Sequence, residues 1–436
     1  MRTEVFSRLA MAQAPRRLFP QLSPRHAFGA AVRSWRDRRG LSQAELGALA
    51  FVSADLIGKV EKAQRWPAPE LVTALEAALD TDGVIAAFGH ALAAQRQTAK
   101  RAGGGPARSM EQAALDWLLD DDPAPRIMGD NAMGWVDDEV VDGVARRLEE
   151  FRRLDHVQGA GMVFPMVTAY ASADLARLLA SRPSSAEVAV RLYATAAGFW
   201  ELAGYQAIDS GNDELAQGCY LQALDWATAA GDRLLGGYIL AVNSAHLALH
   251  RGEVPLGLRM AKAGLRGTRD LAGPLARSAF TAVAARAHAR HGDERAATQA
   301  ILEAERNLDA ASPEREPGWI RYFTTAYLAD EVAHCFHDLG HPRLAQQQAD
   351  GALAGVSPTH VRRLAIDAAL MASSLARAGL IEQACAVGRQ AADYTAQTSS
   401  ARSRQRLADL RQDLGPFRKE PAVRDLEDYM RALLPL

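Results

Sequence analysis

The chain has 436 residues, 48% of them hydrophobic and 23% charged, and its 50 Lys+Arg against 52 Asp+Glu leave a net charge of -2. This length predicts two or three folded domains, and the composition excludes a chain that is disordered throughout. Three widely separated cysteines exclude a disulfide-stapled secreted fold, and no run of about 18 apolar residues could span a membrane, so we expect a cytoplasmic protein without a membrane partner.

The N-terminal quarter of the chain differs in charge from the rest. Residues 1–24 contain several arginines but no continuous apolar run, and we expect them to form a loose arm. Residues 1–105 hold 15 Lys+Arg and 9 Asp+Glu, a net charge of +6, whereas the remainder holds 35 and 43, a net charge of -8. A basic module on an acidic body favours binding to nucleic acid, because contacts with phosphates supply most of the non-specific affinity.

Residues 25–92 have the pattern of a five-helix domain built around a helix-turn-helix between Leu41 and Trp66. Ser42 and Glu45 form a capping-box pattern at the start of the first helix, and Ser53 is placed to cap the second. Two short helices bury too little to be stable alone, so apolar residues before and after them must close the bundle. The candidates are Val32, Trp35, Leu71, Leu75 and Leu79.

This stretch resembles the DNA-binding domain of the lambda-repressor-like (XRE) family. The resemblance is carried by Leu-Ser-Gln-x-x-Leu at 41–46 and Val-Ser-x-x-x-Ile-x-Lys-Val-Glu at 52–61. It implies that the second helix lies in the major groove of operator DNA, with its N-terminal outer face toward base edges and nearby polar side chains on phosphates. The residues it implies in DNA binding are Gln43, Ser53, Ala54, Asp55, Lys59, Lys62 and Arg65.

The family often carries an ion pair between its first helix and the end of the recognition helix, and Arg36 and Glu61 occupy those positions. The sequence departs from the family at Ala63, where a glycine usually ends the recognition helix. It departs again at Ala54 and Asp55, which offer little to bind a guanine.

Two stretches separate this domain from the rest of the chain. Residues 93–109 are expected to be a flexible linker, because they lose hydrophobic periodicity and contain three glycines followed by Pro106. Residues 110–187 are expected to form a helical connecting region, with a loop-like stretch from Asp155 to Gly161. The segment from Phe151 to Asp155 resembles one in actinobacterial XRE-type regulators with tetratricopeptide-like bodies. On the residues alone, its charges suit a solvated ion pair and a helix cap.

From residue 188 to residue 436 the chain repeats a pattern of small residues. Five glycines, at 211, 252, 292, 340 and 379, are spaced by 41, 40, 48 and 39 residues, and Ala or Gly stands seven before, five after and twelve after each. Such spacing lets two antiparallel helices approach closely, and the glycine ends the first of them. The pattern resembles the tetratricopeptide repeat, which implies a solenoid of helical hairpins with a C-terminal cap. The predicted fold class is therefore all-α, a five-helix domain followed by an α-solenoid.

The repeat geometry of that family also implies which side chains line a concave groove. They are polar and of mixed charge, which suits a peptide or a small polar ligand; the other interpretation is that they are solvated helix faces. Asp330 and nearby histidines share helical spacing but lack a complete ligand set, so no metal is predicted. The implied groove residues are Glu201, Tyr205, Asp209, His246, His250, Arg286, Arg290, Asp330, His334, His337 and Arg377.

No phosphate-binding glycine loop, dinucleotide fingerprint, zinc-protease motif or nucleophile elbow occurs in the chain, so we expect neither an enzyme nor a cofactor. The first functional hypothesis is a transcription regulator that binds double-stranded operator DNA and whose helical body senses a peptide or small-molecule effector, dimerises, or does both. We expect a homodimer. The alternative is a repeat scaffold for a partner protein, with DNA binding secondary.

Overall fold

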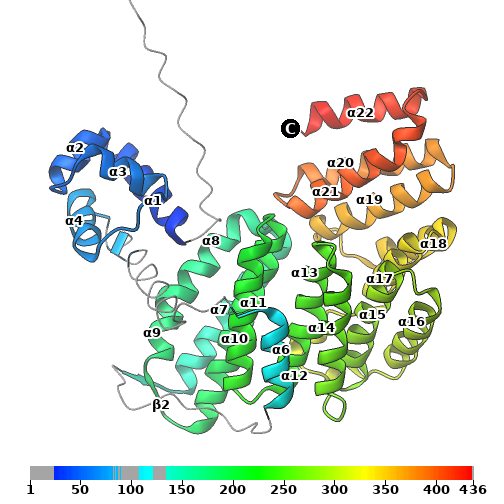
Figure 1. The fold of residues 1–436 in the computed structure, drawn as a ribbon, viewed down its shortest axis with the longest axis horizontal. Coiled ribbons are helices and arrows are strands. Elements are labelled where there is room, and N and C mark those ends of the chain that lie inside the picture. The colour runs from blue at the N-terminus through cyan, green and yellow to red at the C-terminus, as the bar shows by residue number, and fades with distance from the viewer. Residues whose placement is uncertain are drawn as a thin grey trace, which may run out of the picture. The chain divides into compact units, whose positions relative to one another are not determined.

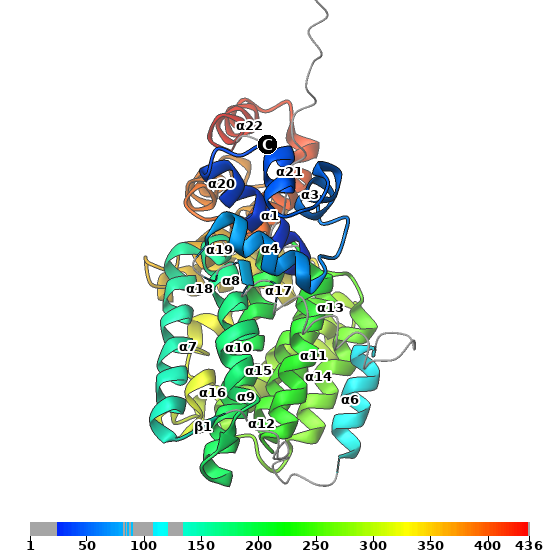
Figure 2. The same ribbon diagram turned by 90° about the vertical axis from the view of Figure 1, so that its left-hand side faces the viewer.

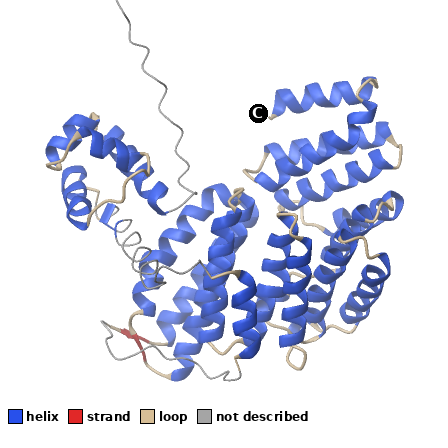
Figure 3. Cartoon of the chain, viewed as in Figure 1, coloured by secondary structure: helices blue, strands red, loops and turns tan. Residues whose placement is uncertain are grey.

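The structure, a computed structural model, describes residues 24–81, 83, 85, 86, 89, 108–120 and 134–434 (Figure 1). The chain divides into two compact units, Met1–Ala99 and Lys100–Leu436. Almost all regular structure in the described residues is helical (Figure 3), which confirms the all-α class. The predicted arm, except Pro24, and the predicted linker, except its last two residues, lie outside the described residues.

In the N-terminal unit, apolar side chains from four helices meet in one core. Phe28, Val32, Leu46, Ile57 and Leu75 are each fully buried there. The fifth helix predicted near the end of 25–92 falls mostly on residues outside the described part. The four helices are α1 (Pro24–Arg38), α2 (Gln43–Leu49), α3 (Ala54–Glu61) and α4 (Pro69–Leu79).

The two predicted helix caps are present at the starts of α2 and α3. The Ser42 hydroxyl accepts the backbone N–H of Glu45 at 3.2 Å, and the Glu45 carboxylate accepts the backbone N–H of Ser42 at 2.7 Å, which completes the capping box. The Ser53 hydroxyl accepts the N–H of Leu56 at 3.2 Å. Between the helices Phe51 has φ of 58°. The turn therefore holds a non-glycine residue in the left-handed region.

Ala63, one of the departures from the family pattern, adopts the same unusual conformation, with φ of 56° just after α3. A side chain in the left-handed region costs about 1–2 kcal/mol, because its Cβ crowds the following carbonyl. The structure thus explains why a glycine is common at this position.

We expect Ala63→Gly to raise the free energy of unfolding of the N-terminal unit by about 1 kcal/mol, since relief of strain outweighs the greater chain entropy of glycine. Ala48→Gly is the matched control, because Ala48 is exposed within the right-handed helix α2 and the change there should cost about 1 kcal/mol. Thermal unfolding of both variants makes the measurement. A variant at position 63 that melts below the wild type would contradict the strain argument.

The second unit begins with several helices and one short two-stranded parallel sheet. Trp135 pairs in parallel with Arg182 and Val136 with Pro183. The predicted loop from Asp155 to Gly161 is wrong in extent, because α7 continues through Asp155 and breaks only at Gly159, where φ is 76°. The elements are α6 (Met110–Leu119), β1 (Trp135–Val136), α7 (Asp138–Gln158), α8 (Ala160–Tyr170), η2 (Ala171–Leu175), α9 (Ala176–Leu179) and β2 (Arg182–Pro183).

Helical hairpins then follow one another, at the positions of the sequence repeats. Figure 2 shows the long helices α7, α10 and α11 side by side, and α10 contacts both of the others. In the second hairpin α12, η3 and α13 form one continuous helix. The elements are α10 (Ala186–Asp209), α11 (Asp213–Ala229), α12 (Arg233–Tyr238), η3 (Ile239–Ser244), α13 (Ala245–His250), α14 (Val254–Gly267), α15 (Pro274–Arg290), α16 (Glu294–Asp309), η4 (Pro313–Arg315), η5 (Gly318–Ile320), α17 (Thr325–Asp338), α18 (Pro342–Gly355), α19 (Val361–Arg377), α20 (Ile381–Ala396), α21 (Ala401–Leu414), η6 (Gly415–Phe417) and α22 (Pro421–Leu433).

The repeated small residues lie at the seams of the hairpins. All five repeat glycines have φ between 75° and 82°, so each ends a first helix in a conformation that favours glycine. A Cβ added to Gly264 would lie 2.5 Å from the carbonyl oxygen of Gly237 and from the Cβ of Ala241. Helix α14 can therefore approach its partner helix only because position 264 has no side chain.

The end of the body returns to its beginning. Helix α21 contacts α10, and α19 contacts α7. The contact is polar, because Arg362 of α19 donates to Asp155 of α7 and to Asp209 of α10. The hairpins thus curve until residues far apart in sequence enclose a common space. No helix in the described part of the chain has the length and apolar character needed to cross a bilayer.

Candidate functional site

The outer face of α3 is the first candidate site. Ser53, Ala54, Asp55 and Lys59 are all exposed, while Ile57 on the opposite face is fully buried. Lys59 Nζ lies 2.7 Å from Asp55 Oδ2 on the solvent side of the helix. The face that the XRE resemblance assigns to DNA is therefore free within the N-terminal unit. Lys62 and Arg65, after the end of α3, are also exposed.

Gln43, whose phosphate contact stays a prediction, links the two helices of the helix-turn-helix. Its side-chain Nε2 donates to Glu61 Oε2 at 2.7 Å, so the amide joins α2 to the end of α3. The amide nitrogen carries two hydrogens, so this bond to Glu61 does not preclude the phosphate contact that the resemblance implies. The buried carboxylate of Glu61 needs hydrogen-bond donors, and the Gln43 amide supplies one of them.

Glu61 is the centre of a buried ionic network. Its carboxylate is fully buried and accepts Arg36 Nε at 2.5 Å and Arg36 Nη2 at 3.2 Å. Arg33 Nε lies 3.5 Å from the same carboxylate. The hydrogen bond to Glu61 raises the pKa of Arg36 above its usual value. The geometry thus contains the ion pair that the resemblance implies, with Gln43 and Arg33 as additional partners.

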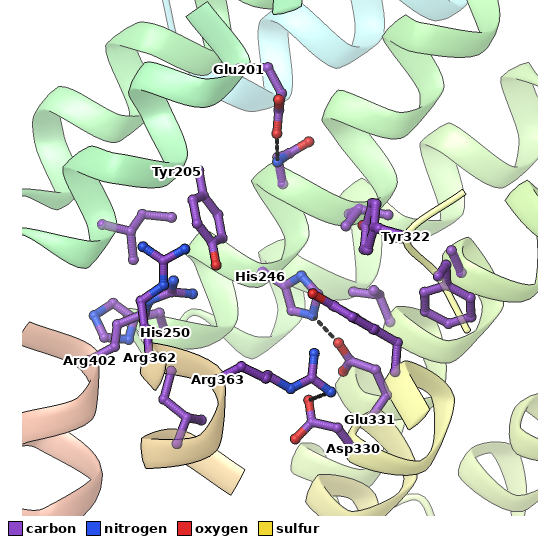
Figure 4. A pocket seen from close by; sticks show the side chains of 18 of the residues that line it. Glu201, Tyr205, His246, His250, Tyr322, Asp330, Glu331, Arg362, Arg363 and Arg402 are labelled. Carbon is purple, nitrogen blue, oxygen red and sulfur yellow. Dashed lines mark hydrogen bonds and ion pairs between the residues drawn. The ribbon is translucent and has the colours of Figure 1, made fainter. Parts of the chain in front are cut away.

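The second candidate site is a cavity of about 760 Å³ inside the helical body (Figure 4). Side chains from α7 through α21 line it, which is possible because the hairpins curve back on themselves. Of the residues predicted to face a groove, those that line the cavity are Glu201, Tyr205, His246, His250, Arg286, Arg290, Asp330 and His334.

The other predicted groove residues, Asp209, His337 and Arg377, do not line the cavity. Asp209 is fully buried in the contact between α10, α19 and α21. His337 turns toward α19, where its Nδ1 lies 3.1 Å from Ser374 Oγ. Arg377 pairs with Asp413 at 3.0 Å. Neighbouring helices bury Asp209 and His337, whereas the side chain of Arg377 is 43% exposed outside the cavity.

A polar clasp, made of Asp155, Asp209, Arg362, Ser400 and Arg402, closes the cavity on one side. Arg362 Nη2 donates to Asp155 Oδ2 at 2.7 Å, and Arg362 Nη1 donates to Asp209 Oδ2 at 3.1 Å. Arg402 Nε donates to Asp209 Oδ1 at 3.1 Å. Although burial opposes it, Arg362 and Arg402 hold the pKa of Asp209 below its usual value.

Tyr205 lies between the two arginines of the clasp. The guanidinium carbon of Arg362 is 4.8 Å from the centre of its ring, and that of Arg402 is 4.5 Å away. The two cations therefore have an aromatic partner as well as a carboxylate. Figure 4 shows Tyr205 above Arg362 and Arg402 at the edge of the cavity.

A second ionic group lies deeper, on α13, α15 and α17. Glu331 Oε1 is 3.0 Å from His246 Nε2, and Glu331 Oε2 is 3.1 Å from Arg286 Nη1. Burial opposes ionisation, but His246 and Arg286 hold the pKa of Glu331 well below its usual value. The neighbouring Asp330 is 3.5 Å from Arg363 Nη2. Figure 4 draws both of these carboxylates pointing toward their cationic partners.

The wall formed by α12 and the segment before α17 is aromatic. The hydroxyls of Tyr238 and Tyr322 are 3.0 Å apart, and burial raises the pKa of both phenols. The ring of Trp319 is 4.7 Å from that of Tyr238, and the ring of Tyr327 is 5.0 Å from that of Tyr322. The cavity thus combines charged groups with an aromatic wall.

Several cavity residues were absent from the sequence prediction. Arg152 and Asp155 belong to the α7 segment from Phe151 to Asp155 that resembles other regulators, so a signal for them was present, and His156 directly follows that segment. Four arginines of α19 and α21 could not be predicted from the sequence, because they lie outside the repeat positions that the family resemblance assigns to the groove. These are Arg362, Arg363, Arg402 and Arg406.

Comparison with known proteins identifies only the N-terminal part of the chain. A family model described as a helix-turn-helix domain matches residues 27–88. No curated protein matches the sequence. The matched residues include α2 and α3 with their caps, and the helical body lies outside the match.

Proposed function

We propose that this chain is a transcription regulator that binds double-stranded operator DNA through its helix-turn-helix domain and senses a peptide or small molecule in the cavity of its body. The observation that carries the proposal is the helix-turn-helix itself: a match over residues 27–88 and a capped helix α3 whose outer face is exposed. In such domains the second helix enters the major groove.

The finer parts of the proposal have separate support. The motifs of α2 and α3 support a lambda-repressor-like (XRE) type, and the glycine-ended hairpins support a tetratricopeptide-like body. A volume of about 760 Å³ is in the range of small-molecule sites, roughly 300–1,000 Å³. A homodimer would read two half-sites one DNA turn apart, as symmetric helix-turn-helix proteins do. We assign no catalytic step to the cavity.

Selection from a pool of random duplexes tests the DNA-binding part. The full chain should enrich one motif, and a duplex with that motif should bind at least about a thousandfold more tightly than a scrambled one at matched salt. A symmetric motif would support the dimer. A pool that remains random after repeated selection would remove operator binding from the proposal.

Asp55 gives a sharper prediction about the same face. Its carboxylate lies at the N-terminal end of the recognition helix, and its side chain is 71% exposed. The carboxylate forms an ion pair with the ammonium group of Lys59. We expect Asp55→Asn to tighten binding to all duplexes, because it removes repulsion from phosphates and frees Lys59. The logarithm of the binding constant should then fall more steeply with the logarithm of salt concentration, by about one unit of slope.

Glu382→Gln serves as the control for this measurement, since Glu382 is exposed on α20 of the body and the change removes the same charge. Its affinity and salt dependence should equal those of the wild type. Equal tightening by both variants would mean that only the net charge of the chain matters, and that α3 has no special position on DNA.

A further inference from the structure

Three arginines that line one part of the cavity, Arg286, Arg290 and Arg406, differ in their carboxylate partners. Arg406 has a single ionic contact, Nη1 to Asp409 Oδ2 at 3.3 Å, and Arg286 shares Glu331 with His246. Within the described residues Arg290 has no carboxylate within 4.0 Å, although it lines the same cavity. Of these three arginines, Arg290 is therefore the one without a carboxylate within ion-pair distance in the described part of the chain.

The surroundings show that these cations affect one another. Burial lowers the pKa of Arg406, and Arg286 lowers it further, against the attraction of Asp409, Asp338 and Asp330. His250 and His334 face the same groups and cannot neutralise them. Burial lowers the pKa of both histidines. The charges of Arg286 and Arg406 lower the pKa of His334 further. Those of Arg406 and Arg290 do the same at His250. An anion placed here would relieve this repulsion.

The rest of the cavity limits what that anion could be. A simple inorganic ion would leave most of about 760 Å³ to water, beside the rings of Tyr238, Trp319 and Tyr322. Aromatic walls favour a ligand with a flat apolar body. A cationic ligand would add charge beside Arg290 and Arg406, which is unfavourable in a partly buried site.

We propose that the cavity binds an organic anion with an aromatic or similarly flat apolar body, whose carboxylate or phosphate group pairs with Arg290 and Arg406. The inference rests on the proposed role of the body as a sensor and names the chemical class of the effector. Binding would bridge α15 and α21, which belong to different hairpins, so the ligand would hold the curved body closed.

Two fluorescent probes of the same shape test the charge requirement. Anilinonaphthalene sulfonate is an aromatic anion, and phenylnaphthylamine has the same rings without the charge. The full chain should bind one anilinonaphthalene sulfonate, and the double variant Arg290→Gln with Arg406→Gln should weaken it by about tenfold or more, since two charge-assisted hydrogen bonds are lost. The affinity for phenylnaphthylamine should not change.

The matched control is Arg295→Gln with Arg404→Gln. Arg295 is exposed on α16, which forms one hairpin with α15, and Arg404 is exposed on α21, the helix that carries Arg406. It should bind both probes as the wild type does. Unchanged binding of the sulfonate to the cavity variant, or equal loss of both probes, would overturn the proposal. If the double variant does not fold, Arg290→Gln alone keeps the test, because Arg290 has no ion pair to lose within the described residues.

Displacement of the bound probe then separates the two sources of negative charge. Naphthyl phosphate should displace it better than naphthoate if the group recognised is a phosphate, and the reverse order would indicate a carboxylate. Displacement by neither would count against the proposal. Failure here, together with an enriched DNA motif, would refute the ligand class and leave the regulator function standing, so the two results are distinguishable.

Discussion

Replacing Glu61 by alanine should destabilise the N-terminal unit by about 3–5 kcal/mol. The carboxylate is fully buried, and its removal leaves Arg36, 12% exposed, without its bidentate partner. Arg33 and Gln43 lose the same acceptor. An intact buried ion pair contributes little to the free energy of unfolding. When one partner is removed, the other charge stays buried without compensation, and this is strongly destabilising. Operator binding should be lost with the fold.

Hydrogen exchange of the full chain measures this effect separately in each unit. Amides of α1 and α3 should lose protection in Glu61→Ala, whereas amides of α15 and α16 should keep it. Glu70→Ala is the control, since it removes an identical side chain from the same unit. Glu70 is exposed in the first turn of α4. Wild-type protection of α3 in Glu61→Ala would show that the network does not hold the recognition helix.

The second large effect is expected at Arg362 in the polar clasp. Arg362→Leu leaves two buried carboxylates, Asp155 and Asp209, without their shared cation, and should lower the free energy of unfolding of the body by about 3–5 kcal/mol at neutral pH. Asp209 keeps Arg402 and Asp155 keeps Gln206, so the body should remain folded but open more readily between α7 and α19.

The pH dependence of this effect has a definite sign. Because the folded-state pKa of Asp209 is depressed, the stability it contributes is present above its unfolded pKa, about 3.9, and is lost as the pH falls through the folded value. The difference between wild type and Arg362→Leu should therefore be largest above about pH 5 and narrow below about pH 4.

Urea unfolding at several pH values makes the measurement. Arg404→Leu, an exposed arginine on α21, should unfold as the wild type does. Addition of Asp155→Asn to Arg362→Leu should restore part of the lost stability, since it removes one of the stranded charges. A loss at Arg362 that is constant with pH would show that packing, and not the carboxylates, accounts for it.

The amino-acid sequence alone determined the features whose causes lie within a few tens of residues. The caps at Ser42 and Ser53, the five glycines that end first helices, and the small residues at the hairpin seams follow from local backbone preference and close packing. The pair of Arg36 and Glu61 came from the family resemblance, and the structure places them in contact. The face of α3 was likewise predictable, because helical periodicity separates Ile57 from Lys59.

Tertiary structure alone decided how far the hairpins curve, and hence which charges meet. Arg362 pairs with Asp155 across 207 residues and with Asp209 across 153, and no local pattern encodes such a contact. Small errors in the rotation of each hairpin accumulate along a solenoid, so closure cannot be read from one repeat. For that reason the sequence predicted a groove containing His337 and Arg377, whereas the folded chain curves around a cavity that they do not line. Four other arginines are in its wall: Arg362, Arg363, Arg402 and Arg406.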